Sequence, residues 1–223
     1  DPTGEVAWQS LRNMAVQLGQ RDELRRLAQL LHERRCTFTP SGETPIDIDC
    51  SLPENRERSQ CLVLSDISNI AYQDALEMYH NAERASGDEQ RRLYDRSARL
   101  LIDAVDRNPA DPQGPLALEY AATALERTGR FDSAARIYQR ILDEVSSRRG
   151  ANDEENERLP ATVANAQFRL AFNANQSFDF ERAIENYTVL ADNPRFVNSR
   201  DPNVRQKRED ALINMALISE STR

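Results

Sequence analysis

Four residues able to bind a metal or form a disulfide lie in the N-terminal part of the sequence: His32, Cys36, Cys50 and Cys61. One histidine and three cysteines are a ligand set for a closed tetrahedral zinc site. However, 13 residues separate Cys36 from Cys50 and 10 separate Cys50 from Cys61, unlike the short spacing of common zinc motifs. We therefore expect a disulfide between two of the cysteines, with free thiols and a zinc site as alternatives. A disulfide would indicate an oxidising compartment.

The location of the cysteines supports a crosslink but does not select the pair. All three fall in or beside a segment with little helical periodicity that contains Pro40, Gly42, Pro45 and Pro53. A long loop with little apolar content gains most from a disulfide, on the order of 3 kcal/mol. The pairs Cys36–Cys50, Cys36–Cys61 and Cys50–Cys61 stay equally open.

Catalytic chemistry has little support in this sequence. His32 and His80 are the only histidines, and no glycine-rich phosphate-binding loop or nucleophile elbow is present. The neighbouring carboxylates Glu154 and Glu155 fall in a predicted loop. We therefore predict a protein that is not an enzyme and that binds no cofactor and no metal.

Composition restricts the classes of partner and of fold. With 29 basic and 37 acidic residues, the net charge of -8 disfavours a nucleic-acid-binding protein, which needs a dense cationic surface. No apolar run approaches the roughly 20 residues that span a bilayer, so we expect no membrane insertion. The 39% apolar and 6% aromatic content, with 7 glycines in 223 residues, favours an all-α protein.

The elements that would position these residues repeat along the sequence. Relative to Ala134, the apolar or small residues Leu118, Ala121, Ala122, Leu125, Gly129 and Phe131 precede, and Tyr138 and Ile141 follow. The same offsets from Ala183 give Gln167, Leu170, Ala171, Ala174, Phe178, Phe180, Tyr187 and Leu190. Spacings of three and four with a turn between them predict two antiparallel helices that meet at small residues. Partial copies lie around Leu24, where Arg12 takes a small-residue position, and around Ala98.

These repeats and the breakers between them divide the chain into seven segments. We predict helical hairpins over 1–35, 65–109, 110–145 and 160–194, a loop insertion with cysteines and prolines over 36–64, and an acidic loop over 146–159. A linker and one capping helix, without a partner helix, fill 195–223. Asp111 before Pro112 and Asp201 before Pro202 are typical of helix N-caps, and Pro160 also precedes a helical pattern.

The sequence resembles the tetratricopeptide repeat family over about two thirds of its length. The resemblance is carried by Trp8 with Leu11, by the segments 129–134 and 180–183, and by the Asn-Pro pairs at 108–109 and 193–194. Only one interval between repeats is close to the family period of about 34 residues, which implies insertions. The family resemblance implies an α-solenoid of antiparallel hairpins with a concave groove lined by the first helix of each pair.

The resemblance also implies which side chains face that groove and bind a peptide or protein segment. They are Asn13, Glu119, Thr123, Glu126, Arg127, Asn165, Phe168, Phe172, Asn175 and Gln176. Asn and Gln can hydrogen-bond an extended peptide backbone, and an exposed Phe can receive its apolar side chains. Phe168 and Phe172 could equally be core residues that pack against a neighbouring helix.

The Pro-rich string 108–115 before a new hairpin is similar to tetratricopeptide proteins of bacterial envelopes, notably deltaproteobacterial ones. We therefore expect a non-catalytic protein-interaction scaffold of a periplasmic or other envelope assembly, such as outer-membrane or motility machinery. Because the sequence begins at Asp1 without Met, we expect a processed chain or a fragment. The alternatives are a regulatory fragment of a larger chain that contains an enzyme, and a zinc-stabilised structural domain. The partner and the oligomeric state stay open.

Overall fold

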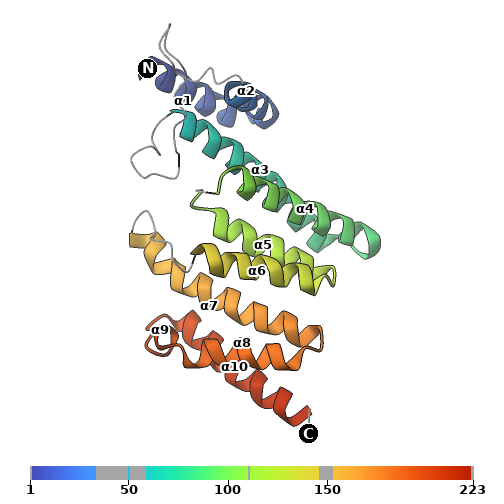
Figure 1. The fold of residues 1–223 in the computed structure, drawn as a ribbon. Helices are drawn as coiled ribbons and strands as arrows, with labels where there is room; N and C mark the ends of the chain where they lie inside the picture. The colour runs from blue at the N-terminus through green and yellow to red at the C-terminus, as the bar shows by residue number, and fades with distance from the viewer. Residues whose placement is uncertain (1, 34–49, 51–58, 110, 146–152, 222–223) are drawn as a thin grey trace. The chain divides into compact units, whose positions relative to one another are not determined.

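The computed structural model describes residues 2–33, 50, 59–109, 111–145 and 153–221, and every regular element in these ranges is helical. The elements are α1 Pro2–Gln17, α2 Arg21–Glu33, α3 Ser59–Arg84, α4 Gly87–Arg107, α5 Gly114–Arg127, α6 Phe131–Val145, α7 Asp153–Gln176, α8 Phe180–Asp192, α9 Pro194–Val197 and α10 Pro202–Ser221 (Figure 1). This confirms the predicted all-α class. Among the helices described, none has both the length and the apolar content needed to cross a membrane.

The chain divides into two compact units. Unit 1 contains residues 1–74 and 103–111, and unit 2 contains residues 75–102 and 112–223. The boundary between them falls inside α3 and inside α4. Each unit is therefore described by its own helices and contacts.

Three helical hairpins close with the same turn. A backbone N–H donates to the carbonyl five residues earlier in each, from Gln20 to Ala15, Arg130 to Leu125 and Asp179 to Ala174, at 2.8 Å, 2.9 Å and 2.9 Å. The residue before each donor has a positive φ: Gly19 at 68°, Gly129 at 76° and Phe178 at 61°. Such left-handed residues are a common end of α-helices. The three turns lie at the same offset from Leu24, Ala134 and Ala183, so the alignment by spacing identified equivalent positions.

Small residues line the contacts between helices in unit 2, as the sequence predicts. Ala121, Ala122, Ala134, Ala171 and Ala183 are fully buried. The chain packs α5 against α6, α6 against α7 and α7 against α8, and α10 contacts both α7 and α8. Figure 1 shows these helices as successive neighbours in chain order. The last long helix, α10, therefore packs on the preceding hairpin.

Unit 1 has its own core, formed by α1, α2 and the first half of α3. Its buried side chains are Trp8, Ala15, Leu24, Ala28, Val63, Ile67 and Ile70. The buried carboxylate of Asp66 accepts a hydrogen bond from Trp8 Nε1 at 3.0 Å and pairs with Arg12 Nε at 2.8 Å. Burial raises the pKa of Asp66, while the Trp8 hydrogen bond and the Arg12 charge oppose this shift. These contacts explain how Arg12 is accommodated at a small-residue position.

Two predicted insertions are shorter than the sequence suggests. The acidic loop predicted over 146–159 is wrong over 153–159, because α7 already begins at Asp153 and continues through Pro160. The cysteine-containing insertion predicted over 36–64 is wrong over 59–64, because α3 begins at Ser59. Neither 153–159 nor 59–64 contains Gly or Pro, and α7 accommodates Pro160 inside the helix although that proline lacks a backbone N–H donor.

The two predicted N-caps have different outcomes. Asp201 caps α10, since its carboxylate accepts the backbone N–H of Asn203 at 2.8 Å and the helix begins at Pro202. Asp111 is not a cap, because α5 begins at Gly114. Its carboxylate instead accepts a hydrogen bond from the Asn108 side chain at 3.3 Å.

Candidate interaction face on α5 and α7

The first helices of two successive hairpins, α5 and α7, are joined side by side by polar contacts. Asn165 Nδ2 donates to Glu119 Oε1 at 3.1 Å, and Asn173 Nδ2 donates to Glu126 Oε1 at 2.6 Å. The second contact lies seven residues after the first on α5 and eight residues after the first on α7. Because both steps go toward the C-terminus, α5 and α7 run parallel. Buried alanines line the contacts inside each hairpin, together with polar contacts such as Thr123 with Tyr138 and Gln167 with Asn186, whereas this lateral contact uses carboxylates.

A buried charge cluster lies at the C-terminal part of this contact. Arg169 forms an ion pair with Glu126, whose side chain is only 5% exposed. Asn173 is 1% exposed, and its Nδ2 also donates to the Arg169 carbonyl at 2.7 Å. Burial lowers the pKa of Arg169. Within the described residues, Asn173 Oδ1 and the Tyr187 hydroxyl are buried without a hydrogen-bond partner. The cluster thus holds polar groups that the fold only partly satisfies.

A second polar cluster surrounds Glu119, nearer the N-termini of α5 and α7. Burial raises the pKa of Glu119, and the hydrogen bond from Asn165 and the charge of Lys207 oppose the shift. Lys207 from α10 lies over the Phe168 ring, with its Nζ 4.6 Å from the ring centroid. Phe168 is 8% exposed and packs on Tyr187, with ring centroids 5.5 Å apart. The structure therefore places Phe168 in the core beneath α10.

The second phenylalanine with two possible roles, Phe172, is half-buried. The guanidinium carbon of Arg169 lies 4.9 Å from its ring centroid, a cation–π arrangement. The Arg169 side chain is 27% exposed, so one edge of this stacked pair reaches the surface. Of the two rings, Phe172 is the one that a bound segment could contact.

The other predicted groove residues differ in accessibility. Thr123 is half-buried, and its hydroxyl donates to the Glu119 carbonyl at 2.9 Å. Asn175 is half-buried, while Arg127 and Gln176 are exposed near the C-terminal ends of α5 and α7. Asn13 is exposed on α1, in unit 1. The accessible part of the α5 and α7 face therefore consists of Arg127, Phe172, Asn175 and Gln176, with the edge of Arg169.

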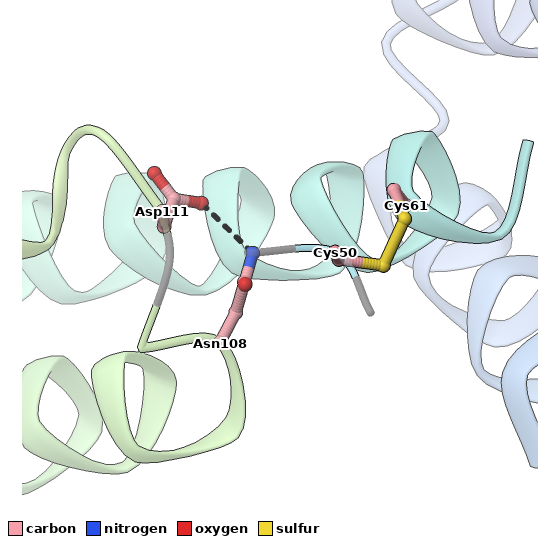
Figure 2. The surroundings of a disulfide bond; sticks show 4 residues. All are labelled: Cys50, Cys61, Asn108 and Asp111. Atoms are coloured by element: carbon pink, nitrogen blue, oxygen red, sulfur yellow. Dashed lines mark hydrogen bonds between the residues drawn. A yellow bond between two sulfur atoms is a disulfide. The ribbon is translucent and has the colours of Figure 1, made fainter. Parts of the chain in front are cut away.

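The structure pairs Cys50 with Cys61 in a disulfide, with a Cα–Cα distance of 5.4 Å (Figure 2). Figure 2 also shows Asn108 and Asp111, whose turn belongs to the same unit as the disulfide. The third candidate, Cys36, and the His32 side chain lie outside the described residues. Because the two bonded sulfurs cannot act as thiolate ligands, the four-ligand zinc site does not fit this structure. In the described part of the chain, no three His, Cys, Asp or Glu residues cluster as metal ligands.

The remaining histidine and the hollow beside the α5–α6 turn show no catalytic arrangement. His80 is exposed, and its Nδ1 lies 2.9 Å from Glu83 on the same helix. A hollow of about 280 Å³ is lined by Gly129, Arg130, Phe131, Asp132, Ser133 and Ser177. Ser177 Oγ donates to Asp132 at 3.4 Å there, with no histidine or cysteine in the lining.

Sequence reasoning missed three residues of this face: Arg169, Asn173 and Lys207. A signal for Asn173 exists, because it shares one helical stripe with the buried residues Ala166 and Leu170. A polar residue on an apolar stripe indicates a buried polar contact. Arg169 lies three residues before its ring partner Phe172, but nothing local indicates its ion pair with Glu126 on α5. Lys207 on α10 contacts Phe168 on α7, which is far away in the sequence.

Comparisons with protein-family models, curated proteins and solved structures give no match to this chain.

Proposed function

We propose that this chain is a non-catalytic protein-interaction scaffold, built from hairpins of the tetratricopeptide type, that binds a peptide or protein segment along α5 and α7. One observation carries the proposal. The two first helices run parallel and meet through two carboxylate–amide hydrogen bonds and the ion pair of Arg169 with Glu126. The shared turn geometry of three hairpins supports their equivalence as repeats.

The accessible side chains suit an extended segment rather than a small molecule. Gln176 and Asn175 each offer a donor and an acceptor to a peptide backbone. The Phe172 ring, stacked under Arg169, offers a flat apolar surface, and Arg127 adds an exposed cation at the C-terminal end of α5. The buried Arg169–Glu126–Asn173 cluster holds the stacked pair in place. Backbone recognition with one aromatic contact is a recurring mode of peptide binding.

The disulfide supports an oxidising compartment, and we place the scaffold in the periplasm or another compartment of a cell envelope. Disulfides persist in such compartments and are rare in the reducing cytosol. An envelope scaffold would assemble other proteins, as the resemblance to bacterial envelope proteins implies.

The test is a quantitative pull-down from native envelope extract with three forms of the chain. Arg127→Ala/Gln176→Ala removes two exposed side chains of the α5 and α7 face. Arg136→Ala/Gln139→Ala removes the same residue types from the exposed side of α6 and is the matched control. We expect the first variant to lose partners that the wild type and the control retain. Identical partner sets for all three forms would contradict binding at this face.

A further inference from the structure

The last long helix, α10, is apolar on two opposite sides. Val204, Ala211 and Ile218, seven residues apart, are buried on the side that contacts α7 and α8. On the other side, Leu212, Ile213 and Leu217 are 44%, 57% and 58% exposed. Ala216 is exposed between them. A helix that packs on one side only normally carries polar residues on the other, so this outer face is unusual.

Charged residues flank the outer apolar residues in a self-complementary order. Arg205 lies seven residues before Leu212, and Glu220 lies seven residues after Ile213. Seven residues are close to two helical turns, so Arg205, Leu212, Ile213 and Glu220 share the outer side. Arg205 and Glu220 are exposed, and neither has an ion-pair partner among the described residues.

We propose that the outer face of α10 binds the same face of a second copy of this chain, with the two helices antiparallel. A two-fold axis between residues 212 and 213 places Leu212 opposite the partner's Ile213. The same axis places Arg205 opposite Glu220 of the partner subunit, twice in the dimer. Ala216 then faces the partner's Glu209, where a small residue leaves room for the glutamate stem. One register thus pairs Leu212 with Ile213 and Arg205 with Glu220, each twice, as an isologous interface requires.

The size of this face predicts a weak, concentration-dependent dimer. A helix of 20 residues is roughly 30 Å long, and one face of it offers less than the ~800 Å² per partner of standard stable interfaces. We therefore expect monomer and dimer to exchange at accessible protein concentrations.

Sedimentation velocity of the full chain over a range of concentrations tests the apolar part of the interface. We expect the wild type to shift from monomer to dimer and Leu212→Glu/Ile213→Glu to stay monomeric, with unchanged helicity in circular dichroism. Val189→Glu, at an exposed apolar residue of α8, is the matched control and should dimerise like the wild type. A wild type that stays monomeric, or a dimer that survives the α10 substitutions, would overturn the proposal.

Charge reversal tests the antiparallel register. Arg205→Glu and Glu220→Arg should each weaken the homodimer, by about tenfold, because each creates two like-charge pairs. An equimolar mixture of the two variants should restore dimerisation, since both ion pairs re-form in the heterodimer. Failure of the mixture to associate better than either variant alone would show that the register is wrong.

Discussion

At the scale of single residues, two equivalent turns allow the free-energy cost of a positive φ to be compared between glycine and phenylalanine. Gly129 and Phe178 occupy the same turn position and both have a positive φ. Glycine adopts this conformation freely, whereas other L-residues incur about 1–2 kcal/mol. Phe178 is 81% exposed, so little buried packing offsets that cost.

The two turns therefore predict opposite effects of two substitutions. Phe178→Gly should raise the free energy of unfolding by about 1 kcal/mol, because it removes the strained φ. Gly129→Ala should lower it by about 1 kcal/mol, and the effect is conformational because a Cβ at Gly129 meets no atom within 4 Å. Urea denaturation of both variants measures this. Equal effects of the same sign would contradict the equivalence of the turns.

The Glu119 carboxyl predicts a pH dependence of stability. Burial raises its pKa in the folded state, so the folded chain holds the proton more tightly than the unfolded chain does. Its contribution to stability is full below the unfolded pKa of about 4.3 and is lost as the pH rises through the raised folded value. Glu119→Gln keeps an acceptor for Asn165 but cannot ionise.

We expect Glu119→Gln to be more stable than the wild type at pH 7, with the difference disappearing near pH 4. Free energies of unfolding measured by urea denaturation at several pH values test this. A difference that stays constant from pH 4 to pH 7 would contradict the assignment.

At the scale of elements, the sequence predicts what happens inside a hairpin better than what happens between hairpins. The offsets around Ala134 and Ala183 identify two helix pairs and their turns, because both helices of a pair are close in sequence. The start of α7 at Asp153 was missed because Pro160 is typical of a first helical turn but lies inside this helix. No residue near Ser59 comparably marks the start of α3.

The candidate face was predictable only in part for a related reason. Glu119 and Glu126 were identified as groove residues, but their partners Asn165 and Asn173 come from the next hairpin. Phe168 is buried because Lys207 and α10 cover it. The residues near Phe168 in sequence do not indicate that α10 packs there. Arg127, Asn175 and Gln176 were predicted to line the groove; Arg127 and Gln176 are exposed and Asn175 is half-buried.

The disulfide gives a prediction for the elements of unit 1. Cys61 lies 11 positions after Cys50 in sequence, a loop for which closure entropy gives about 3 kcal/mol of stabilisation. Cys50→Ser/Cys61→Ser should lower the midpoint of the Trp8 fluorescence transition, because Trp8 is the sole tryptophan and is buried in unit 1. An unchanged transition would contradict a stabilising bridge.

The covalent pairing can be tested separately from its effect on stability. Of three cysteines, two are paired, which leaves one. Alkylation of the unreduced, denatured chain should therefore label one thiol, at Cys36. Labelling of Cys50 and Cys61 would contradict the pairing and would remove the support for an oxidising compartment.

At the scale of the whole molecule, two surfaces of unit 2 have different roles in this account. The α5 and α7 face is polar and partly buried, with a few accessible groups suited to a peptide backbone. The outer face of α10 is apolar, with flanking charges suited to a second copy. Because the substitutions that test one face lie on different helices from those that test the other, partner binding and dimerisation can be changed independently. Loss of one with retention of the other would show that they are separate functions.

The most direct measurement of the proposed function is site-specific photo-crosslinking in native envelope extract. A photoreactive residue in place of Gln176 reports on the α5 and α7 face, and one in place of Gln139 reports on the exposed side of α6. We predict a crosslinked partner from position 176 that excess unlabelled chain competes away, and none from position 139. The same products from both positions, or none from position 176, would contradict binding at this face.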